Sequence, residues 1–320
     1  MRHFLDFEKP LYELEARIEE LRNLNEQEGG VNLADDILKL REKANRFLEE
    51  TYAQLSPWQK VQVARHPQRP HTSDYIAALV DGFVPLAGDR NYAEDPAILC
   101  GLGYLDHHPV CILGHEKGKD TEQRVACNFG MPKPEGYRKA ARMMTLAGRF
   151  QLPILTLVDT AGADPGVQSE ERGQAEAIAN AIETCLNVPT PIISIICGEG
   201  GSGGAIAIAI ANKIFMLEHA VYSVISPEGC SSILWGNASK HKTAAENLKM
   251  TAQDLKKMNL IDDIIPEPLG GAHRKKKTIY HNVKQTLLQA LEELAPLDSE
   301  TLQQQRTQKF IDQTRQFVKN

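Results

Sequence analysis

The stretch Pro191–Ala211 constrains the fold of this chain more than any other stretch of its sequence. It begins with the β-branched apolar run Pro191–Cys197, which is typical of a buried strand. It continues with Gly198–Gly204 (GEGGSGG), and it ends with the uncharged segment Ala205–Ala211, which predicts the start of a buried helix. A chain that passes from a strand through glycines into a helix exposes backbone N–H groups at the positive end of that helix. We therefore expect a site for negative charge there, either a phosphate or an oxyanion.

Three short patterns overlap in this stretch. Gly198-x-Gly200-x-x-Gly203 fits the GxGxxG fingerprint of dinucleotide sites, and Gly200-x-Ser202-x-Gly204 fits the GxSxG turn that carries a nucleophilic serine. The third interpretation is an oxyanion hole made of backbone N–H groups alone. The late position of the glycines, after several strands, disfavours a dinucleotide. The glycine neighbours of Ser202 favour a hydroxyl that caps backbone N–H groups, although the histidines of the chain leave a catalytic triad open.

Composition excludes several broad classes of protein. A net charge of -6 argues against general nucleic-acid binding, and 42% hydrophobic residues suffice for a sizeable core. The six cysteines are widely spaced and form no CxxC pair, which predicts no metal site in this chain and a reducing compartment. No apolar run has the length of a membrane span, and the N-terminus does not resemble a signal peptide. We therefore expect a cytoplasmic protein.

The N-terminal region predicts two helices. A helical stripe of Leu11, Leu14, Ile18 and Leu21 ends at a break in Asn25–Gly30, and a second amphipathic helix follows from about Leu33 to Leu55. This helical arm could pack on the body of the protein or bind a partner, and the sequence leaves both interpretations open.

Two basic segments are interpreted as solvated. Ser56–Thr72 is rich in His, Arg, Gln and Pro, and its composition favours a linker over a site where Arg65 and Arg69 bind a phosphate or a carboxylate of a partner. The run Arg274–Lys277 (RKKK) is predicted to be a solvated helix face.

The body of the chain alternates strands and helices. The predicted strands are 97–105, 109–114, 153–158, 191–197, 213–217, 222–225 and 260–265. The predicted helices are 134–150, 169–186, 205–211, 227–235, 244–250, 252–258, 275–294 and 299–318.

Glycines gather in the loops after successive strands, at Asp159–Gly166, Gly198–Gly204 and Ser226–Gly229. In an α/β body such loops meet at one crevice. Asp159 and Glu199 are the nearest carboxylates, and each is either a general base or an anchor for its loop.

At these residues the chain resembles the carboxyltransferase α subunits of bacterial acetyl-coenzyme A carboxylases. The matching stretches cover nearly the whole chain in order: Phe4–Pro10, Ala64–Pro70, Gly114–Gly118, Asn128–Lys139, Asp159–Gly166, Glu170–Ala177, Gly198–Ala205, Tyr222–Trp235 and Leu260–Arg274. The resemblance implies an α/β, crotonase-like (ClpP/crotonase) fold of ββα units. It divides the chain into an N-terminal helical arm (1–55), a carboxyltransferase domain (56–296) and a C-terminal helix (297–320).

The resemblance also implies a function. Such a subunit transfers a carboxyl group from carboxybiotin, held on the biotin carboxyl carrier protein, to acetyl-CoA, and the malonyl-CoA product enters fatty acid biosynthesis. The implied partners are a zinc-ribbon β subunit in an α2β2 assembly, which faces CoA, and biotin carboxylase. The alternative is a stand-alone crotonase-fold acyl-CoA hydratase, isomerase or hydrolase.

The site implied by the resemblance lies in two glycine-rich loops. Backbone N–H groups of Gly203 and Gly204 would hold the negative charge left on biotin, which could then take a proton from the acetyl group, so that no side-chain base is required. The biotin pocket would be lined by Gly162, Ala163, Gly166, Gly200 and Gly201. The chain has DTAGADPG where the family usually has DTPGAYPG. Ala161 is therefore expected to loosen the turn, and Asp164 to place a negative charge near the pocket. These departures would either weaken biotin docking or mark a divergent enzyme.

Overall fold

The computed structural model describes residues 3–27 and 33–318, and a central sheet organises them. The strands are β1 (Asp81–Pro85), β2 (Ile98–Leu105), β3 (His108–His115), β4 (Ile154–Thr160), β5 (Ile192–Gly201), β6 (Lys213–Leu217), β7 (Val221–Ser223) and β8 (Asp263–Ile265). Their order in the sheet is β1-β2-β3-β4-β5-β6-β8, and β7 pairs with β5. β1, β2 and β3 are antiparallel neighbours, whereas β3 to β6 run parallel, so their carboxyl ends lie at one edge.

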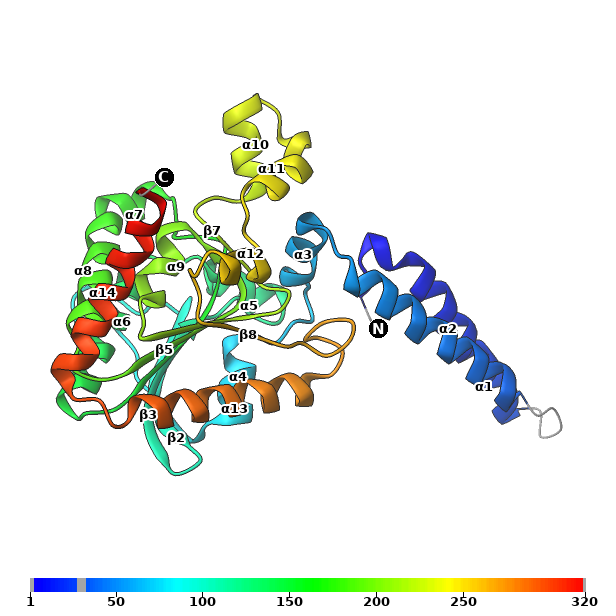
Figure 1. The fold of residues 1–320 in the computed structure, drawn as a ribbon, viewed down its shortest axis with the longest axis horizontal. Coiled ribbons are helices and arrows are strands. Elements are labelled where there is room, and N and C mark those ends of the chain that lie inside the picture. The colour runs from blue at the N-terminus through cyan, green and yellow to red at the C-terminus, as the bar shows by residue number, and fades with distance from the viewer. Residues whose placement is uncertain (1–2, 28–32, 319–320) are drawn as a thin grey trace.

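Helices cover both faces of the sheet. In the body these are α3 (Pro57–Ala64), α4 (Thr72–Leu79), α5 (Thr121–Ala126), α6 (Pro134–Arg149), α7 (Val167–Glu171), α8 (Gln174–Asn187), α9 (Ser202–Ala209), α10 (Pro227–Trp235), α11 (His241–Asn247), α12 (Ala252–Lys257), α13 (Lys276–Leu294) and α14 (Ser299–Val318). Short 3-10 turns are η1 (Asp6–Glu8), η2 (Asn128–Gly130) and η3 (Ala238–Lys240). α6, α8 and α9 pack together on one face, and α4 and α13 pack together on the other (Figure 1). β4 is buried along its whole length, as expected of a central parallel strand.

The two predicted N-terminal helices form a hairpin that projects from the body (Figure 1). They are α1 (Lys9–Gln27) and α2 (Ala34–Ala53), and residues 28–30 of the predicted break lie outside the described residues. At the base of the hairpin the buried Glu8 carboxylate accepts hydrogen bonds from Tyr52 Oη (3.1 Å) and Arg274 Nη2 (3.3 Å). The prediction that Arg274 lies on a solvated helix face was therefore wrong, because this guanidinium fixes the hairpin to the body.

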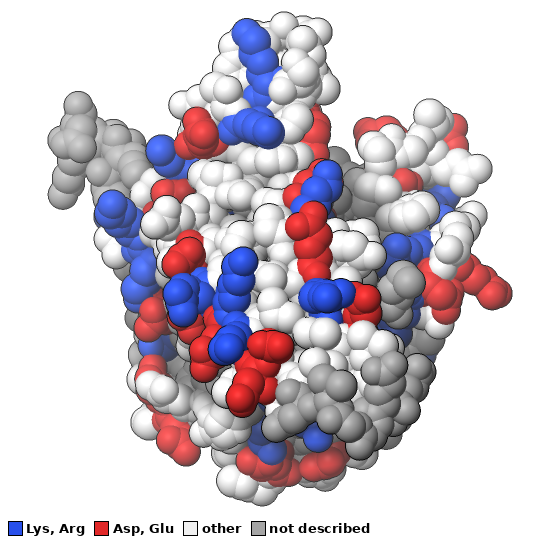
Figure 2. Space-filling view, turned by 90° about the vertical axis from the view of Figure 1, so that its right-hand side faces the viewer, with Lys and Arg blue, Asp and Glu red and all other residues white. Residues whose placement is uncertain are grey.

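Charged side chains of both signs are interspersed over the face toward which the hairpin points (Figure 2). Lys and Arg side chains lie beside Asp and Glu side chains there, rather than in one extended basic area.

The segment 56–72 is not the solvated linker that its composition predicted. Pro57–Ala64 forms α3, which Ser56 caps by accepting a hydrogen bond from the backbone N–H of Gln59 (3.3 Å). Beyond this helix, Arg65 and Arg69 turn inward to carboxylates of the same chain. Sequence reasoning failed here because those carboxylates lie more than a hundred residues away.

Two helical predictions need correction. The single helix predicted over 169–186 is divided into α7 and α8, because Gly173 adopts a left-handed conformation (φ +82°) between them. The helix predicted over 244–250 lies earlier, at His241–Asn247. The other long helices agree closely with their predicted ranges. α12 begins after its N-cap Thr251, whose hydroxyl accepts a hydrogen bond from the backbone N–H of Asp254 (3.2 Å).

The C-terminal helix is fixed to the body by a buried arginine. Arg306 of α14 donates to the carbonyl of Thr190 (3.0 Å) and to Asn212 Oδ1 (2.8 Å), and it also bonds the carbonyl of Val188 just after α8. Burial lowers the pKa of Arg306 to about 10, since these partners are uncharged carbonyl oxygens. The division into an arm, a domain and a C-terminal helix stays a prediction.

Within the described ranges, no helix combines the length and apolarity that a membrane span needs. In the same residues no group of His, Cys, Asp and Glu side chains could hold a metal ion. All six cysteines are free thiols, and five of them are buried.

Candidate active site

The strand-to-helix transition in Pro191–Ala211 is sharper than the sequence predicted. β5 continues through the first glycines to Gly201, and α9 begins at Ser202, so the segment Gly198–Gly204 is mostly strand and helix rather than an open turn. Ser202 makes the turn with a left-handed backbone (φ +54°). The N-cap of α9 is Gly201, so the expectation that the Ser202 hydroxyl caps this helix was wrong.

The glycines allow the ends of β4 and β5 to approach each other closely. A Cβ atom at Gly201 would lie 2.1 Å from the carbonyl oxygen of Ala161, and one at Gly204 would lie 2.5 Å from the backbone nitrogen of Ala163. One at Gly198 would lie 2.4 Å from Asp159 Oδ1. These distances are far shorter than real Cβ contacts. The loop after β4 therefore packs directly on the glycines, as the convergence of these two loops predicted.

The structure brings together four of the seven predicted site residues. Gly162 and Ala163 lie against Gly201 and Gly204 in the loop contact just described. Gly203 is half-exposed beside them, and the nearest atoms to its Cβ position belong to Ile178, at 3.7 Å. This leaves the first turn of α9 accessible from the Gly203 side.

The other two predicted residues lie apart from this contact. Gly200 lies against the ring of Tyr222, and a Cβ atom at Gly200 would lie 2.7 Å from Tyr222 Cδ2. Gly166 is the N-cap of α7, and its Cβ position faces the carboxylate of Asp164. Their assignment to the pocket stays a prediction.

Backbone N–H groups supply the positive potential at this site. Gly203 and Gly204 are the second and third residues of α9. The first four N–H groups of a helix have no partner within the helix, and the helix dipole makes this end positive. The arrangement can therefore bind an oxyanion without a charged side chain.

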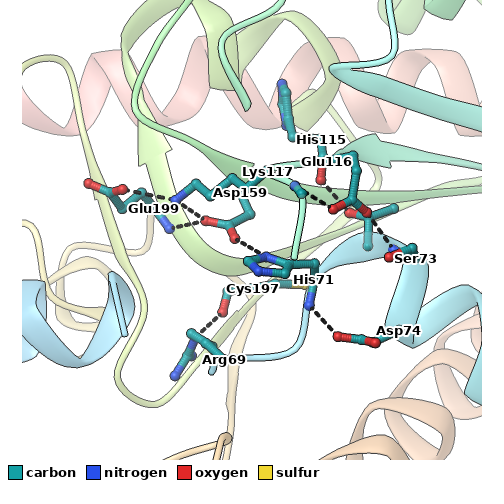
Figure 3. A network of polar contacts seen from close by, with 12 residues as sticks. Arg69, His71, Ser73, Asp74, His115, Glu116, Lys117, Asp159, Cys197 and Glu199 are labelled. Carbon is teal, nitrogen blue, oxygen red and sulfur yellow. Dashed lines mark hydrogen bonds and ion pairs between the residues drawn. The ribbon is translucent and has the colours of Figure 1, made fainter. Parts of the chain in front are cut away.

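A buried ionic network lies behind the loops (Figure 3). Lys117 Nζ contacts Asp159 Oδ1 (2.7 Å) and Glu199 Oε2 (2.9 Å). Arg65 joins the other oxygen of Glu199 (2.6 Å) to Glu228 of α10 (2.5 Å). The charges at the ends of β4 and β5 are thus paired within the chain.

The pairing decides the role of the two carboxylates. Burial by itself would raise the pKa of Asp159, but the Lys117 ammonium outweighs burial and holds that pKa well below its usual range. The pKa of Glu199 is also lowered, because Lys117 and Arg65 outweigh its desolvation. A carboxylate held in this way is a poor proton acceptor near pH 7. Of the two alternatives that the sequence left open, the geometry favours anchors over general bases.

Asp164 also anchors its loop. Its carboxylate accepts hydrogen bonds from Asn128 Nδ2 (3.1 Å) and Ser169 Oγ (2.5 Å), and its backbone N–H donates to the carbonyl of Pro132 (2.9 Å). The Asp164 side chain therefore bonds residues of α7 and η2. The expectations that Ala161 loosens the turn and that Asp164 weakens biotin docking stay predictions.

A cavity of about 270 Å³ adjoins the network. Its lining includes Ala161, Asp159, Glu199, Lys117, Arg65, His71, Arg124 and Phe129. Phe129 is 55% exposed and lies in a run of three left-handed residues, Asn128, Phe129 and Gly130 (φ +45°, +55° and +78°). Strained backbone of this kind concentrates at functional sites.

Sequence reasoning named Asp159 and Glu199, but it missed Lys117 and assigned Arg65 to a solvated linker. Lys117 and Arg65 stand in the stretches Gly114–Gly118 and Ala64–Pro70, which carried the family resemblance but no chemical motif. Their partners are 82 and 134 residues away in sequence, so only the fold could pair them. One signal in the sequence could have pointed to Lys117 and Arg65, because both lie in stretches that match the family.

Comparison with known proteins shows the family of this chain. Residues 4–314 match the family model of acetyl co-enzyme A carboxylase carboxyltransferase-like proteins. The acetyl-coenzyme A carboxylase carboxyl transferase subunit alpha of Paramagnetospirillum magneticum is 58% identical over 98% of this chain and 98% of its own length. Those of Rhodospirillum centenum and Rhizobium meliloti are 57% and 54% identical over 97% and 98% of this chain, and each match covers 98% of the relative.

Solved structures share the fold at low sequence identity. A transcarboxylase 12S structure with methylmalonyl-coenzyme A matches with a TM-score of 0.59 and 18% identity, over 71% of this chain and 42% of that chain. A Pseudomonas malonate decarboxylase hetero-tetramer in complex with coenzyme A matches with a TM-score of 0.57 and 16% identity, over 70% of this chain and 91% of that chain. These neighbours have the crotonase-like fold that the sequence predicted.

Proposed function

Because the chain belongs to the acetyl-coenzyme A carboxylase carboxyltransferase α-subunit family, we propose that its two packed glycine loops hold the negative charge that develops during carboxyl transfer. The chain is an enzyme subunit of acetyl-CoA carboxylase, with a role in fatty acid synthesis. The observation that carries the proposal is the first turn of α9. Gly203 and Gly204 lie there at the N-terminal end of the helix, and the loop at Gly162 and Ala163 packs against Gly204.

The residues present fit a biotin ring. The Cβ position of Gly203 has only ordinary van der Waals contact, at 3.7 Å from Ile178, whereas that of Gly204 is packed against backbone. In the proposal, the ligand approaches the helix end from the Gly203 side. In the proposal, Gly203 and Gly204 would hold the ureido oxygen of biotin, and Gly162, Ala163, Gly166, Gly200 and Gly201 would surround the ring. Carboxybiotin, when bound, would supply the carboxyl group, and the nitrogen that loses this group would then be able to accept a proton.

The contribution of the chain is electrostatic and positional. Donors fixed in a folded backbone stabilise a developing oxyanion without reorganising, and the loss of one such donor typically costs about 10²–10³ in rate. Asp159 and Glu199 remain ionised and paired, so they hold the loops in place and take no proton. The partners we propose are a β subunit that faces CoA, in an α2β2 assembly, together with the biotin carboxyl carrier protein and biotin carboxylase. We place this complex in the cytoplasm.

An assay of the reverse reaction tests the proposal. The purified chain, mixed with its β subunit, free biotin and malonyl-CoA, is expected to release acetyl-CoA, and neither subunit alone should do so. A β subunit that is active with the α subunit of a relative provides the control. If that β subunit released no acetyl-CoA with this chain, the proposed function would be wrong.

The stand-alone hydrolase is less well supported, although one observation concerns it. The left-handed Ser202 at a strand-to-helix turn has the backbone expected of a nucleophilic serine. However, no histidine of the described chain is hydrogen-bonded to Ser202.

Ser202→Ala is therefore expected to retain carboxyl-transfer activity within about threefold, because the substitution removes a hydroxyl and leaves every backbone donor. Steady-state kinetics with the β subunit measure the effect. Hydrolysis of an acyl-CoA by the isolated chain, abolished in the Ser202→Ala variant, would instead support the hydrolase.

A further inference from the structure

A single lysine joins the ends of three neighbouring strands. Lys117 follows the end of β3 by two residues, and its ammonium contacts Asp159 near the end of β4 and Glu199 near the end of β5 (Figure 3). β3, β4 and β5 are adjacent and parallel. The two loops of the candidate site leave the sheet directly after these carboxylates. We call Lys117, Asp159 and Glu199 the strand-end cluster.

The strand-end cluster also includes a direct bond between the two site strands. Asp159 Oδ1 accepts a hydrogen bond from the backbone N–H of Glu199 (2.9 Å). The absence of a side chain at Gly198 makes room for this carboxylate. Lys117 binds the same oxygen, so the ammonium orients the group that sets the spacing between the ends of β4 and β5.

The side chains of the strand-end cluster are too strongly paired with one another to transfer protons. The three side chains are between 5% and 16% exposed. Desolvation would lower the pKa of Lys117, but Asp159 and Glu199 raise it well above its usual range. An ammonium that stays protonated between two ionised carboxylates can fix geometry but cannot act as an acid or a base at neutral pH.

We propose that Lys117 is a positioning residue for carboxyl transfer, which holds the Gly162–Ala163 loop and the Gly203–Gly204 turn at the spacing that the oxyanion requires. This proposal rests on the proposed function of the site. An error of about 1 Å in a catalytic arrangement can cost about 10² in rate, so the loss of this contact is expected to affect turnover more than substrate binding.

The test begins with Lys117→Met, which keeps the length of the side chain and removes its charge. We expect kcat with the β subunit to fall about 10- to 100-fold, while the KM for malonyl-CoA changes less than about threefold, because the proposed CoA contacts lie on the β subunit. Lys119→Met is the matched control, since Lys119 lies two residues away and its half-exposed ammonium pairs with Asp74 (2.8 Å). An unchanged kcat in Lys117→Met would overturn the proposal.

A neutral triple variant separates positioning from stability. Lys117→Met takes the ammonium away from Asp159 and leaves Glu199 with Arg65 alone, and it therefore destabilises the fold. Lys117→Met combined with Asp159→Asn and Glu199→Gln removes the uncompensated charges. We expect this triple variant to recover most of the lost urea midpoint but to remain at least tenfold below the wild-type kcat. Recovery of kcat together with stability would show that Lys117 acts only through folding.

Two further measurements report on the strand-end cluster itself. In Lys117→Met one carboxylate is expected to bind a proton more readily than in the wild type, which relieves the repulsion, so the activity of this variant relative to the wild type should rise as the pH is lowered. A ratio of variant to wild-type activity that does not change with pH would contradict the proposal.

Amide hydrogen exchange at residues 160–166 and 201–206 should also be faster in Lys117→Met than in Lys119→Met. This second readout needs no activity, so it decides the proposal even if wild-type protein fails to transfer carboxyl groups and the proposed function falls.

Discussion

Gly204→Ala is expected to reduce the carboxyl-transfer kcat by at least about 100-fold, comparable to the loss of an oxyanion donor. The backbone N–H remains, but the new methyl group would lie 2.5 Å from the backbone nitrogen of Ala163 and 2.6 Å from the carbonyl carbon of Gly162. Backbone atoms cannot rotate away, so one of the two loops must move. Overpacking of this kind also destabilises a fold by about 1–3 kcal/mol.

Gly203→Ala provides the comparison for this variant. The nearest atoms to a methyl group there are on Ile178, at 3.7 Å, so the fold can accept it and the N–H is kept. We expect a loss of less than about tenfold, measured by the same acetyl-CoA release with the β subunit and by urea unfolding. Equal losses in the two variants would mean that close packing of the loops does not matter. A normal rate in Gly204→Ala would remove the oxyanion site from this turn.

Arg69→Met is expected to destabilise the protein by about 3–5 kcal/mol at pH 7, as is typical when one partner of a buried ion pair is removed. Arg69 and Glu267 are 2% and 0% exposed, and the guanidinium binds both carboxylate oxygens, at 2.5 Å and 2.9 Å. It also donates to the carbonyl of Cys197 in β5 (2.7 Å). Equilibrium unfolding in urea measures the change in the free energy of unfolding. Arg17→Met, which breaks an exposed pair with Glu20, should change it by less than about 1 kcal/mol.

In Arg69→Met, the contribution of Glu267 to the free energy of unfolding should change with pH in the opposite direction from the wild type. Burial alone would raise the pKa of Glu267, but Arg69 outweighs burial and lowers it to about 2. A depressed pKa stabilises the fold above the unfolded value near 4.5, and this stabilisation is lost as the pH falls toward 2. Without Arg69, desolvation dominates and the pKa of Glu267 rises above the unfolded value. The variant should therefore gain stability from this group as the pH is lowered from 7 to 5. A variant with the wild-type pH profile would contradict this account.

The elements that the sequence predicted well are those whose local pattern is sufficient. α1, α2, α6, α13 and α14 are long amphipathic helices, and their apolar spacing alone predicts them. α4 and β1 were missed because each is short and lies where proline and glycine interrupt the pattern. The continuation of β5 through Gly201 was also missed, since a glycine run in isolation predicts a turn and only the neighbouring Ala161 explains it as strand.

The candidate site was predictable in its backbone and not in its side chains. Glycine density identified Gly204 and the loop at Gly162, because close approach of backbone requires glycine wherever it occurs. Lys117 and Arg69 were not predicted, because a basic residue in a polar segment is ordinarily solvated. Their inward orientation depends on carboxylates that the fold supplies from distant strands and loops.

The hydrogen bond between Glu8 and Arg274 has a consequence for how the protein is made. These residues are 266 positions apart, and Glu8 is completely buried in the folded protein. During translation at about 5–20 residues per second, Glu8 leaves the ribosome well before its cation exists. The helical hairpin can form from its own local contacts in that interval, but its base must stay hydrated. Docking of the hairpin on the body is therefore among the last steps of folding, after nearly the entire sheet has been synthesised.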